Sequence, residues 1–261
     1  MRRLAACALL LGLVTACRPD TVAVSFRPKV GTTYRYEIRV KATSTTTLDG
    51  SPPDRRVEEV RLVAVHTVLD AGADGVRVRV LVGEPGAAAQ AFIVRFDRAA
   101  QLESIESVEG ASAEIVGALG VPEIFPGATG VPAGRRLAPG DRWTVDRTVA
   151  VPGAEQRSRL QVRGRLVELG LAGHEKVARV TSTAELPLRA SATTTGGLLI
   201  LDGDQRIEQR ASYDLDDGAV RGARTTTTGR FHVEVQPPAG TVAPAVPGTL
   251  DVRVTSTTRR L

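Results

Sequence analysis

Apolar and polar residues alternate along several short stretches of this chain. Residues 34–41 read Tyr-Arg-Tyr-Glu-Ile-Arg-Val-Lys, the pattern of a β-strand with one buried and one solvated face. Four further stretches repeat this alternation: Val76–Val80, Leu160–Arg163, Phe231–Val235 and Leu250–Val254. Thr-rich segments also favour strands, because β-branched side chains suit a pleated surface. The pattern predicts about ten to twelve strands in antiparallel sheets.

Turn signals separate these predicted strands. Asp-Gly pairs favour tight hairpin turns, and they occur at residues 49–50, 74–75, 202–203 and 217–218. We therefore expect a turn at each of these four positions.

Three elements occur twice in the same order. Residues 30–34 (Val-Gly-Thr-Thr-Tyr) correspond to residues 139–143 (Pro-Gly-Asp-Arg-Trp), where a glycine turn precedes an aromatic residue that opens a strand. A hairpin follows, over residues 60–82 and 160–181. An aromatic-Asp pair then ends a strand, at Phe96-Asp97 and at Tyr213-Asp214. The sequence therefore predicts an internal repeat, with Tyr34 and Trp143 as equivalent core anchors.

One segment has helical periodicity. The apolar residues of Ile105–Leu119 fall near one helical face, which predicts a short helix that covers a sheet. The expected fold is mainly β, with large twisted antiparallel sheets from two tandem related β units and this one covering helix. The expected organisation is a signal peptide (1–16), a tether (17–21), a first β repeat ending in the helix (22–120), a Pro/Gly connector (121–138) and a second β repeat with a terminal strand (139–261).

The N-terminus has the features of an exported lipoprotein. A basic start precedes the apolar run Leu4–Val14, which is shorter than the ~20 residues of a membrane span but typical of a secretory signal. Residues 13–17 (Leu-Val-Thr-Ala-Cys) resemble the lipobox of bacterial lipoproteins. The resemblance implies cleavage before Cys17, diacylglycerol on its thiol and acylation of the new amine, an anchor that is stable because several chains are buried. The alternative is an ordinary signal peptide followed by a chance cysteine.

The expected location is the cell envelope. Arg18 after the cysteine is similar to cargo sent to the periplasmic face of the outer membrane, and the outer face of the cytoplasmic membrane is the alternative. Cys7 would be removed and Cys17 lipidated. The mature chain would then have no free thiol, which argues against thiol catalysis, redox chemistry and thiolate metal sites.

The charge is basic but distributed along the strands. The formal net charge of +5 becomes +3 once Arg2 and Arg3 are cleaved off. Arginines alternate with apolar residues at 35 and 39, 77 and 79, and 163 and 165, which predicts solvated sheet faces. Contact with anionic lipid headgroups is the functional alternative. We expect no nucleic-acid partner, because the charge is scattered and aromatic residues make up only 3% of the chain.

Candidate catalytic residues are few. The chain lacks the motifs of serine hydrolases, zinc proteases, phosphate-binding loops and dinucleotide-binding folds. Its three histidines, His66, His174 and His232, are expected in two strands and one turn and not in a shared metal site. We expect no enzyme, no cofactor and no metal.

An acidic cluster before Gly218 has two interpretations. Asp214, Asp216 and Asp217 suggest a calcium loop, but Arg224 stands where a helix-loop-helix calcium site needs a Glu. A hairpin turn capped by Asp side chains is the preferred interpretation.

These elements together resemble a family of bacterial secreted and lipid-anchored proteins of unknown function. The resemblance is carried by residues 31–36, 137–143 and 213–218 and covers most of the mature chain, and it implies no catalytic residues. In architecture alone, the chain is similar to half-barrel carriers of lipids or lipoproteins. The expected function is a membrane-anchored, non-catalytic envelope module, structural or interacting with an envelope protein or the cell wall. The alternative is a carrier that holds a lipid or another apolar ligand between sheet and helix, although such pockets are usually rich in aromatic residues.

Overall fold

The computed structural model describes residues 21–98, 100, 102–109, 131–132, 134–149, 158–194, 197–238, 240–241 and 243–261. Within these residues every helix-or-strand element is a β-strand. The strands are β1 (Val22–Ala23), β2 (Thr33–Leu48), β3 (Asp54–Gly72), β4 (Gly75–Gly83), β5 (Gln90–Phe96), β6 (Leu102–Glu109), β7 (Arg136–Leu137), β8 (Arg142–Val149), β9 (Ser158–Ala172), β10 (Glu175–Thr194), β11 (Gly197–Asp214), β12 (Val220–Gln236) and β13 (Val246–Arg260).

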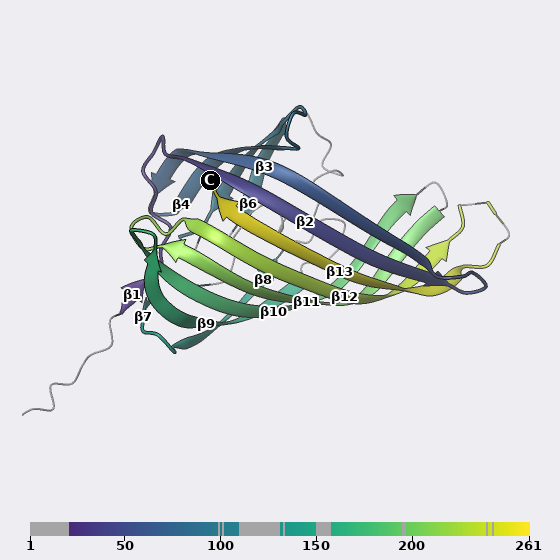
Figure 1. Cartoon of the computed structure of the whole chain (residues 1–261). Coiled ribbons are helices and arrows are strands. Elements are labelled where there is room, and N and C mark those ends of the chain that lie inside the picture. Colours follow the sequence, from purple (N-terminus) through teal and green to yellow (C-terminus); the bar gives the residue numbers. More distant parts are fainter. Residues whose placement is uncertain are drawn as a thin grey trace, which may run out of the picture.

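Eleven of these strands form one antiparallel sheet, in the order β6-β5-β4-β3-β2-β13-β12-β11-β10-β9-β8. Adjacent strands in this order are consecutive in the chain, except that the C-terminal strand β13 pairs with β2 and so joins the first half of the chain to the second. β1 and β7 form a separate two-stranded sheet. The predicted mainly β, antiparallel fold class is confirmed, and both predicted repeats contribute to the same large sheet (Figure 1).

The two faces of the sheet differ in chemistry. In β2, Tyr34, Tyr36 and Ile38 are buried, whereas Arg35 and Arg39 are exposed. Directly paired residues point to the same side of a sheet, so the register carries this alternation from strand to strand. We call the side of Ile38 the inner face and the side of Arg39 the outer face. Figure 1 shows the sheet bent, with β4 and β6 lying behind β2 and β3.

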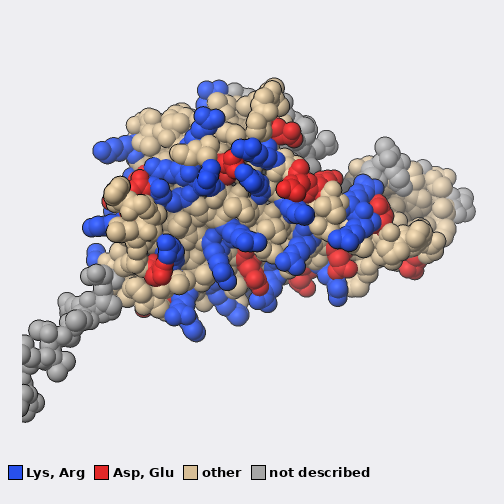
Figure 2. Space-filling model, viewed as in Figure 1, with Lys and Arg blue, Asp and Glu red and all other residues tan. Residues whose placement is uncertain are grey.

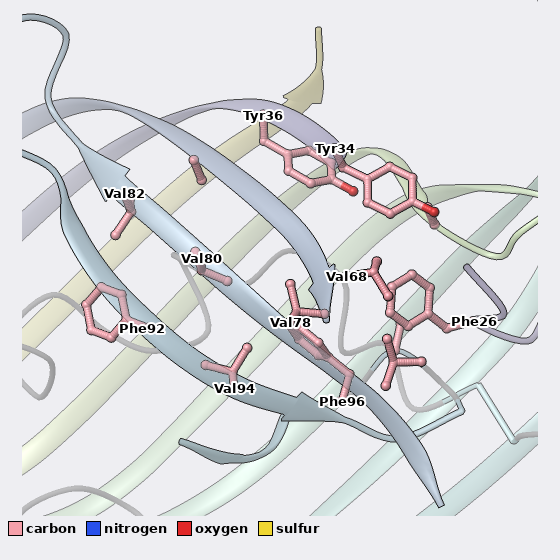
Figure 3. Close-up of a cluster of buried hydrophobic side chains, with 14 of the residues drawn as sticks. Phe26, Tyr34, Tyr36, Val68, Val78, Val80, Val82, Phe92, Val94 and Phe96 are labelled. Atoms are coloured by element: carbon pink, nitrogen blue, oxygen red, sulfur yellow. The ribbon is translucent and has the colours of Figure 1, made fainter. Parts of the chain in front are cut away.

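Buried side chains on the inner face form one cluster in each half. The first half contributes aromatic and Val side chains of β2–β5, many of which Figure 3 shows pointing toward one another. The second half contributes a cluster around Trp143 and Tyr213. These two apolar clusters are the core that stabilises the curled sheet.

The glycine-aromatic motif has the same geometry in both halves. Gly31 and Gly140 have φ angles of 83° and 97°, in the left-handed region that favours glycine. The Gly31 amide donates to the Val68 carbonyl at 2.9 Å, and the Gly140 amide donates to the Leu166 carbonyl at 2.7 Å. Three residues after each glycine, Tyr34 and Trp143 are only 2% and 5% exposed. The prediction that both aromatic residues are core anchors is confirmed.

A β-bulge follows at matching points of the two halves. Val68 pairs with Val78 and Asp70 pairs with Arg77, so Leu69 is the extra residue of the bulge on β3. Leu166 pairs with Val180 and Glu168 pairs with Arg179, so Val167 is the extra residue of the bulge on β9. A bulge leaves its extra residue unpaired, and Leu69 and Val167 are large apolar side chains that remain exposed. The two halves therefore share this irregularity directly after the residue that binds the glycine amide.

Residues 24–27 run between the two halves. The Phe26 amide donates to the Arg98 carbonyl at 2.8 Å, and the Arg27 amide donates to the Asp217 carbonyl at 2.6 Å. The Phe26 side chain packs in the first cluster, whereas Val24 packs in the second. The first strand, β1, begins at Val22 and pairs with β7, which lies in the predicted connector. The start of the described chain therefore ties the two halves together.

The predicted helix over Ile105–Leu119 is wrong in its first part. Residues 102–109 form β6, which pairs with β5 through a register interrupted by two bulges. These bulges disturb the simple alternation, which explains why the apolar spacing suggested a helix. Glu106 of β6 binds Arg77 at 2.5 Å and Arg95 at 3.3 Å, so polar contacts also hold this edge. The remainder of the predicted helix, residues 110–119, lies outside the described residues.

Two other boundary predictions need correction. Residues 202–203 form no turn, because both lie within β11 and pair with strands on each side. A Cβ at Gly203 would lie 2.1 Å from the Arg230 carbonyl oxygen, so close backbone approach explains this glycine. The Asp-Gly turns at 49–50, 74–75 and 217–218 are confirmed. The predicted connector contains β7, and its Leu137 is fully buried.

Candidate functional site

The three histidines do not converge. His66 lies on the inner face, with its ring centroid 4.9 Å from that of Tyr36 and 6.3 Å from that of Phe96. Burial lowers the pKa of His66 to about 4, so the imidazole is neutral in the core. His232 is exposed on β12, and His174 is exposed in the turn between β9 and β10. The predicted placement in two strands and one turn is confirmed.

The Asp side chains before Gly218 bind the turn that contains them. Asp214 Oδ1 accepts a hydrogen bond from the Asp216 amide at 3.0 Å, and Asp217 Oδ1 accepts one from the Ala219 amide at 2.8 Å. This geometry is the Asp-capped turn that the sequence predicts. Across the described part of the chain, no group of three or more His, Cys, Asp or Glu side chains could hold a metal ion.

The second oxygens of the same carboxylates contact other strands. The Tyr34 hydroxyl donates to Asp217 Oδ2 at 2.7 Å, and Arg260 Nη1 lies 3.4 Å from Asp214 Oδ2. The Arg260 guanidinium also lies 5.0 Å from the centre of the Tyr34 ring, in cation–π geometry. Burial and the bond to Asp217 raise the pKa of Tyr34, so its hydroxyl remains a proton donor. These polar groups therefore connect β2, β13 and the β11–β12 turn.

The predicted lipidation site, Cys17, lies outside the described residues. In the part of the chain that the structure describes, no helix is long and apolar enough to cross a bilayer.

The outer face of the sheet is strongly charged. Figure 2 shows basic side chains across this face, with acidic ones between them. The arginines that the sequence predicts on solvated faces all alternate with inner-face residues: Arg35, Arg39, Arg77, Arg79, Arg163 and Arg165. Glu37 binds Arg39 at 2.9 Å and Arg61 at 2.6 Å, and these guanidinium groups lower the pKa of Glu37. Other pairs include Arg230 with Asp251 at 2.8 Å.

One line of directly paired residues crosses eight strands of the outer face. In order from β3 to β8 it consists of Arg61, Arg39, Thr257, Arg224, Arg210, Thr181, Arg165 and Arg142. We call these eight residues the arginine row. It contains three pairs of arginines that face each other directly on neighbouring strands, and a threonine separates each pair from the next.

The arginine row borders a hollow in the outer face. Arg210 and Arg224 line the hollow with the hydroxyl-bearing side chains Thr181, Thr183 and Thr226. Glu208 also lines it, and its carboxylate lies 3.1 Å from Arg206. The hollow has a volume of about 590 Å³ and is open to solvent. Its guanidinium and hydroxyl donors suit an anion.

Only part of this surface could be predicted from the sequence. Alternation predicted that Arg39 and Arg165 face solvent, but Arg142, Arg210 and Arg224 were not selected. Their alignment depends on strand register, and register between distant strands cannot be read from a local pattern. Comparison with protein-family models, with curated proteins and with solved structures gives no match for this chain.

Proposed function

We propose that this chain is an exported lipoprotein that is anchored to a membrane through Cys17 and acts as a non-catalytic interaction module of the cell envelope. The observation that carries the proposal is the contrast between the two sides of the sheet. The inner side buries two apolar clusters, whereas the outer side presents six aligned arginines in a row that crosses eight strands.

The polar residues inside the molecule hold the fold together, and this supports a binding role for the outer face. His66 is buried among aromatic rings, and Asp214 and Asp217 bind their own turn. Tyr34 is held by Asp217. These groups stabilise the fold, so the chemistry that a partner can reach lies on the outer face.

The position of β1 supports an anchor close to the fold. Val22 pairs with Leu137, and Arg136 donates to the Thr21 hydroxyl at 2.9 Å. The five residues 17–21 reach at most about 17 Å when fully extended. A lipid on Cys17 would therefore hold the sheet near the membrane surface.

The anchor is tested by the intact mass of protein extracted from bacterial membranes. We expect a chain that begins at Cys17 and carries diacylglycerol and an N-linked acyl chain. Cys17→Ala should abolish the lipid and move the protein out of the membrane fraction. An unlipidated chain that begins at another residue would contradict the proposal, as would unchanged membrane partition of Cys17→Ala.

A second candidate function is a carrier for an apolar ligand. Beyond the two core clusters, the inner faces of β10, β11 and β13 carry apolar side chains that are only half-buried: Leu188, Leu199, Leu201, Ile207, Leu250, Val252 and Val254. Such side chains could line a site for an acyl chain.

The carrier function is tested by native mass spectrometry and lipid extraction of the mature, unlipidated chain. Lipid that co-purifies at a stoichiometry near one would favour the carrier over the interaction module. A protein that has the mass of the polypeptide alone, with no extractable lipid, would reject it.

A further inference from the structure

We propose that Arg142, Arg165, Arg210 and Arg224 of the arginine row bind the phosphate groups of anionic lipid headgroups. The membrane in question is the one that holds the anchor, so this inference rests on the proposed function. It adds to that function a defined contact surface and the chemistry of its partner.

The register places these four arginines as two facing pairs. Arg224 of β12 pairs directly with Arg210 of β11, and Arg165 of β9 pairs directly with Arg142 of β8. Facing side chains on neighbouring strands have Cβ atoms about 5 Å apart. Both guanidinium groups of a pair can therefore reach one phosphate, and each presents several N–H donors in a planar fork that suits phosphate oxygens.

The four arginines differ from several other arginines of the outer face in their partners. Arg39 and Arg61 share Glu37, and Arg230 binds Asp251. By contrast, the side chains of Arg142, Arg165, Arg210 and Arg224 form no ion pair or hydrogen bond among the described residues. Like charges that face each other across strands are destabilising. An external anion between the two side chains would remove that repulsion.

The hollow next to Arg210 and Arg224 adds neutral donors to this site. Thr181 is itself a member of the row, and Thr226 neighbours Arg224 on the same side of the sheet. Threonine hydroxyls donate hydrogen bonds to phosphate oxygens without adding charge. The hollow can therefore hold one headgroup beside the middle arginine pair of the row.

The length of the arginine row favours a surface that carries many anions, and not a single small anion, as its partner. From β12 to β8 the row crosses four strand spacings, about 19 Å in all. One phosphate can contact one arginine pair, so two separated pairs suit an array of anions. The described outer-face positions on either side of the row carry Thr, Ser, Gly, Val and charged residues and no aromatic ring, so nucleic-acid bases would find no stacking partner.

The row also lies close to the proposed anchor along the chain. Val22 pairs with Leu137 of β7, and Arg142 follows Leu137 by five residues. The tether before Thr21 is equally short. A membrane that holds Cys17 is therefore the polyanionic surface nearest to the end of the row.

The test measures vesicle binding by the mature chain, residues 17–261, with Cys17→Ser. This protein retains every described residue but has no lipid, so anchoring cannot produce binding. Sedimentation is compared for vesicles of phosphatidylcholine alone and vesicles that also contain phosphatidylglycerol. Arg210→Gln/Arg224→Gln is compared with Arg55→Gln/Arg189→Gln, a control that removes the same charge from exposed positions outside the row. Circular dichroism verifies that each variant is folded.

We expect binding to the anionic vesicles that weakens with salt. An arginine near an anionic surface is worth a factor of about five in partition, so the row variant should bind roughly thirtyfold more weakly. The control variant should also bind more weakly, but the logarithm of its loss in affinity should be less than half of that of the row variant.

Three outcomes would overturn the inference. They are equal affinity for neutral and anionic vesicles, equal losses in the two variants, and binding of inorganic phosphate or polyglutamate through Arg210 and Arg224 without vesicle binding. The last outcome would assign the row to a soluble anion or an acidic protein. Failure of the proposed anchor would instead be seen in the intact mass of the membrane-extracted protein, independently of vesicle binding.

Discussion

The Tyr34 hydroxyl donates a hydrogen bond of 2.7 Å to Asp217 Oδ2, so a strand of the first half is bound to a turn of the second half. Asp217 also caps its own turn through Oδ1, and its carbonyl accepts from the Arg27 amide. A single residue thus connects β2, the turn between β11 and β12, and the segment that precedes β2. This contact complements the β2–β13 pairing in holding the two halves in one sheet.

We expect Tyr34→Phe to lower the free energy of unfolding by about 1.5–3 kcal/mol, because a partly buried carboxylate oxygen loses its donor. Urea denaturation measures the change. Tyr36→Phe is the matched control: Tyr36 is buried on the same face, and its hydroxyl makes no hydrogen bond among the described residues. Equal losses in the two variants would show that the bond to Asp217 contributes nothing specific.

The corresponding anchor in the second half depends on a glycine. Trp143 pairs with Gly164 of β9, and a Cβ at Gly164 would lie 2.3 Å from the Trp143 ring. Gly164→Ala should therefore destabilise the protein by about 1–3 kcal/mol through overpacking, and Trp143→Ala by about 3–5 kcal/mol.

A double-mutant cycle measured by thermal denaturation checks this contact. In a Trp143→Phe background, Gly164→Ala should cost less, because the smaller ring leaves room for the added methyl group. If the two substitutions are additive, the ring and the glycine do not restrict each other.

The strands and their faces could be predicted from the sequence because alternation is a local signal. Tyr34–Lys41 shows it without interruption, and the structure places its apolar residues in the core. The prediction fails where the local signal is disturbed. β6 contains bulges, so its spacing resembles that of a helix, and Gly203 serves close packing within β11 although it follows an Asp.

The arginine row could not be predicted from the sequence for a different reason. Arg142 and Arg224 lie 82 residues apart in the chain and meet in one line only through the pairing of five strands. A shift of one residue in any pairing would place one part of the line on the inner face. The candidate site is therefore a property of register, which tertiary structure determines.

The buried His66 should make stability depend on pH. Its folded pKa of about 4 lies below the ordinary value of 6.5, so the unfolded chain binds a proton before the folded chain does. This contribution to stability is complete above pH 6.5 and is lost as the pH falls toward 4, by up to about 3 kcal/mol. Urea denaturation at several pH values measures it.

His66→Phe serves as the control for this pH dependence, because Phe can occupy the space between Tyr36 and Phe96 without titrating. Between pH 6.5 and 4.5 its stability should change much less than that of the wild type. The same slope in both proteins would show that other groups cause the pH dependence.

The arginine row makes a prediction about stability as well as binding. If Arg210 and Arg224 are retained for an external anion, the isolated protein is less stable because of their mutual repulsion. Arg210→Thr/Arg224→Thr should then raise the free energy of unfolding, by about 0.2–1 kcal/mol for removal of the facing like charges, with a further gain from the strand preference of Thr. The gain should shrink at high salt, where exposed charges are screened.

Arg230→Thr is the control for this measurement, because Arg230 lies on the same face and binds Asp251 at 2.8 Å. Its substitution removes an attractive pair, so its stability should stay the same or fall by less than about 1 kcal/mol. Urea denaturation at low and high salt compares the two variants. A loss of stability in Arg210→Thr/Arg224→Thr would mean that these arginines stabilise the fold, in which case their alignment would need no external anion to explain it.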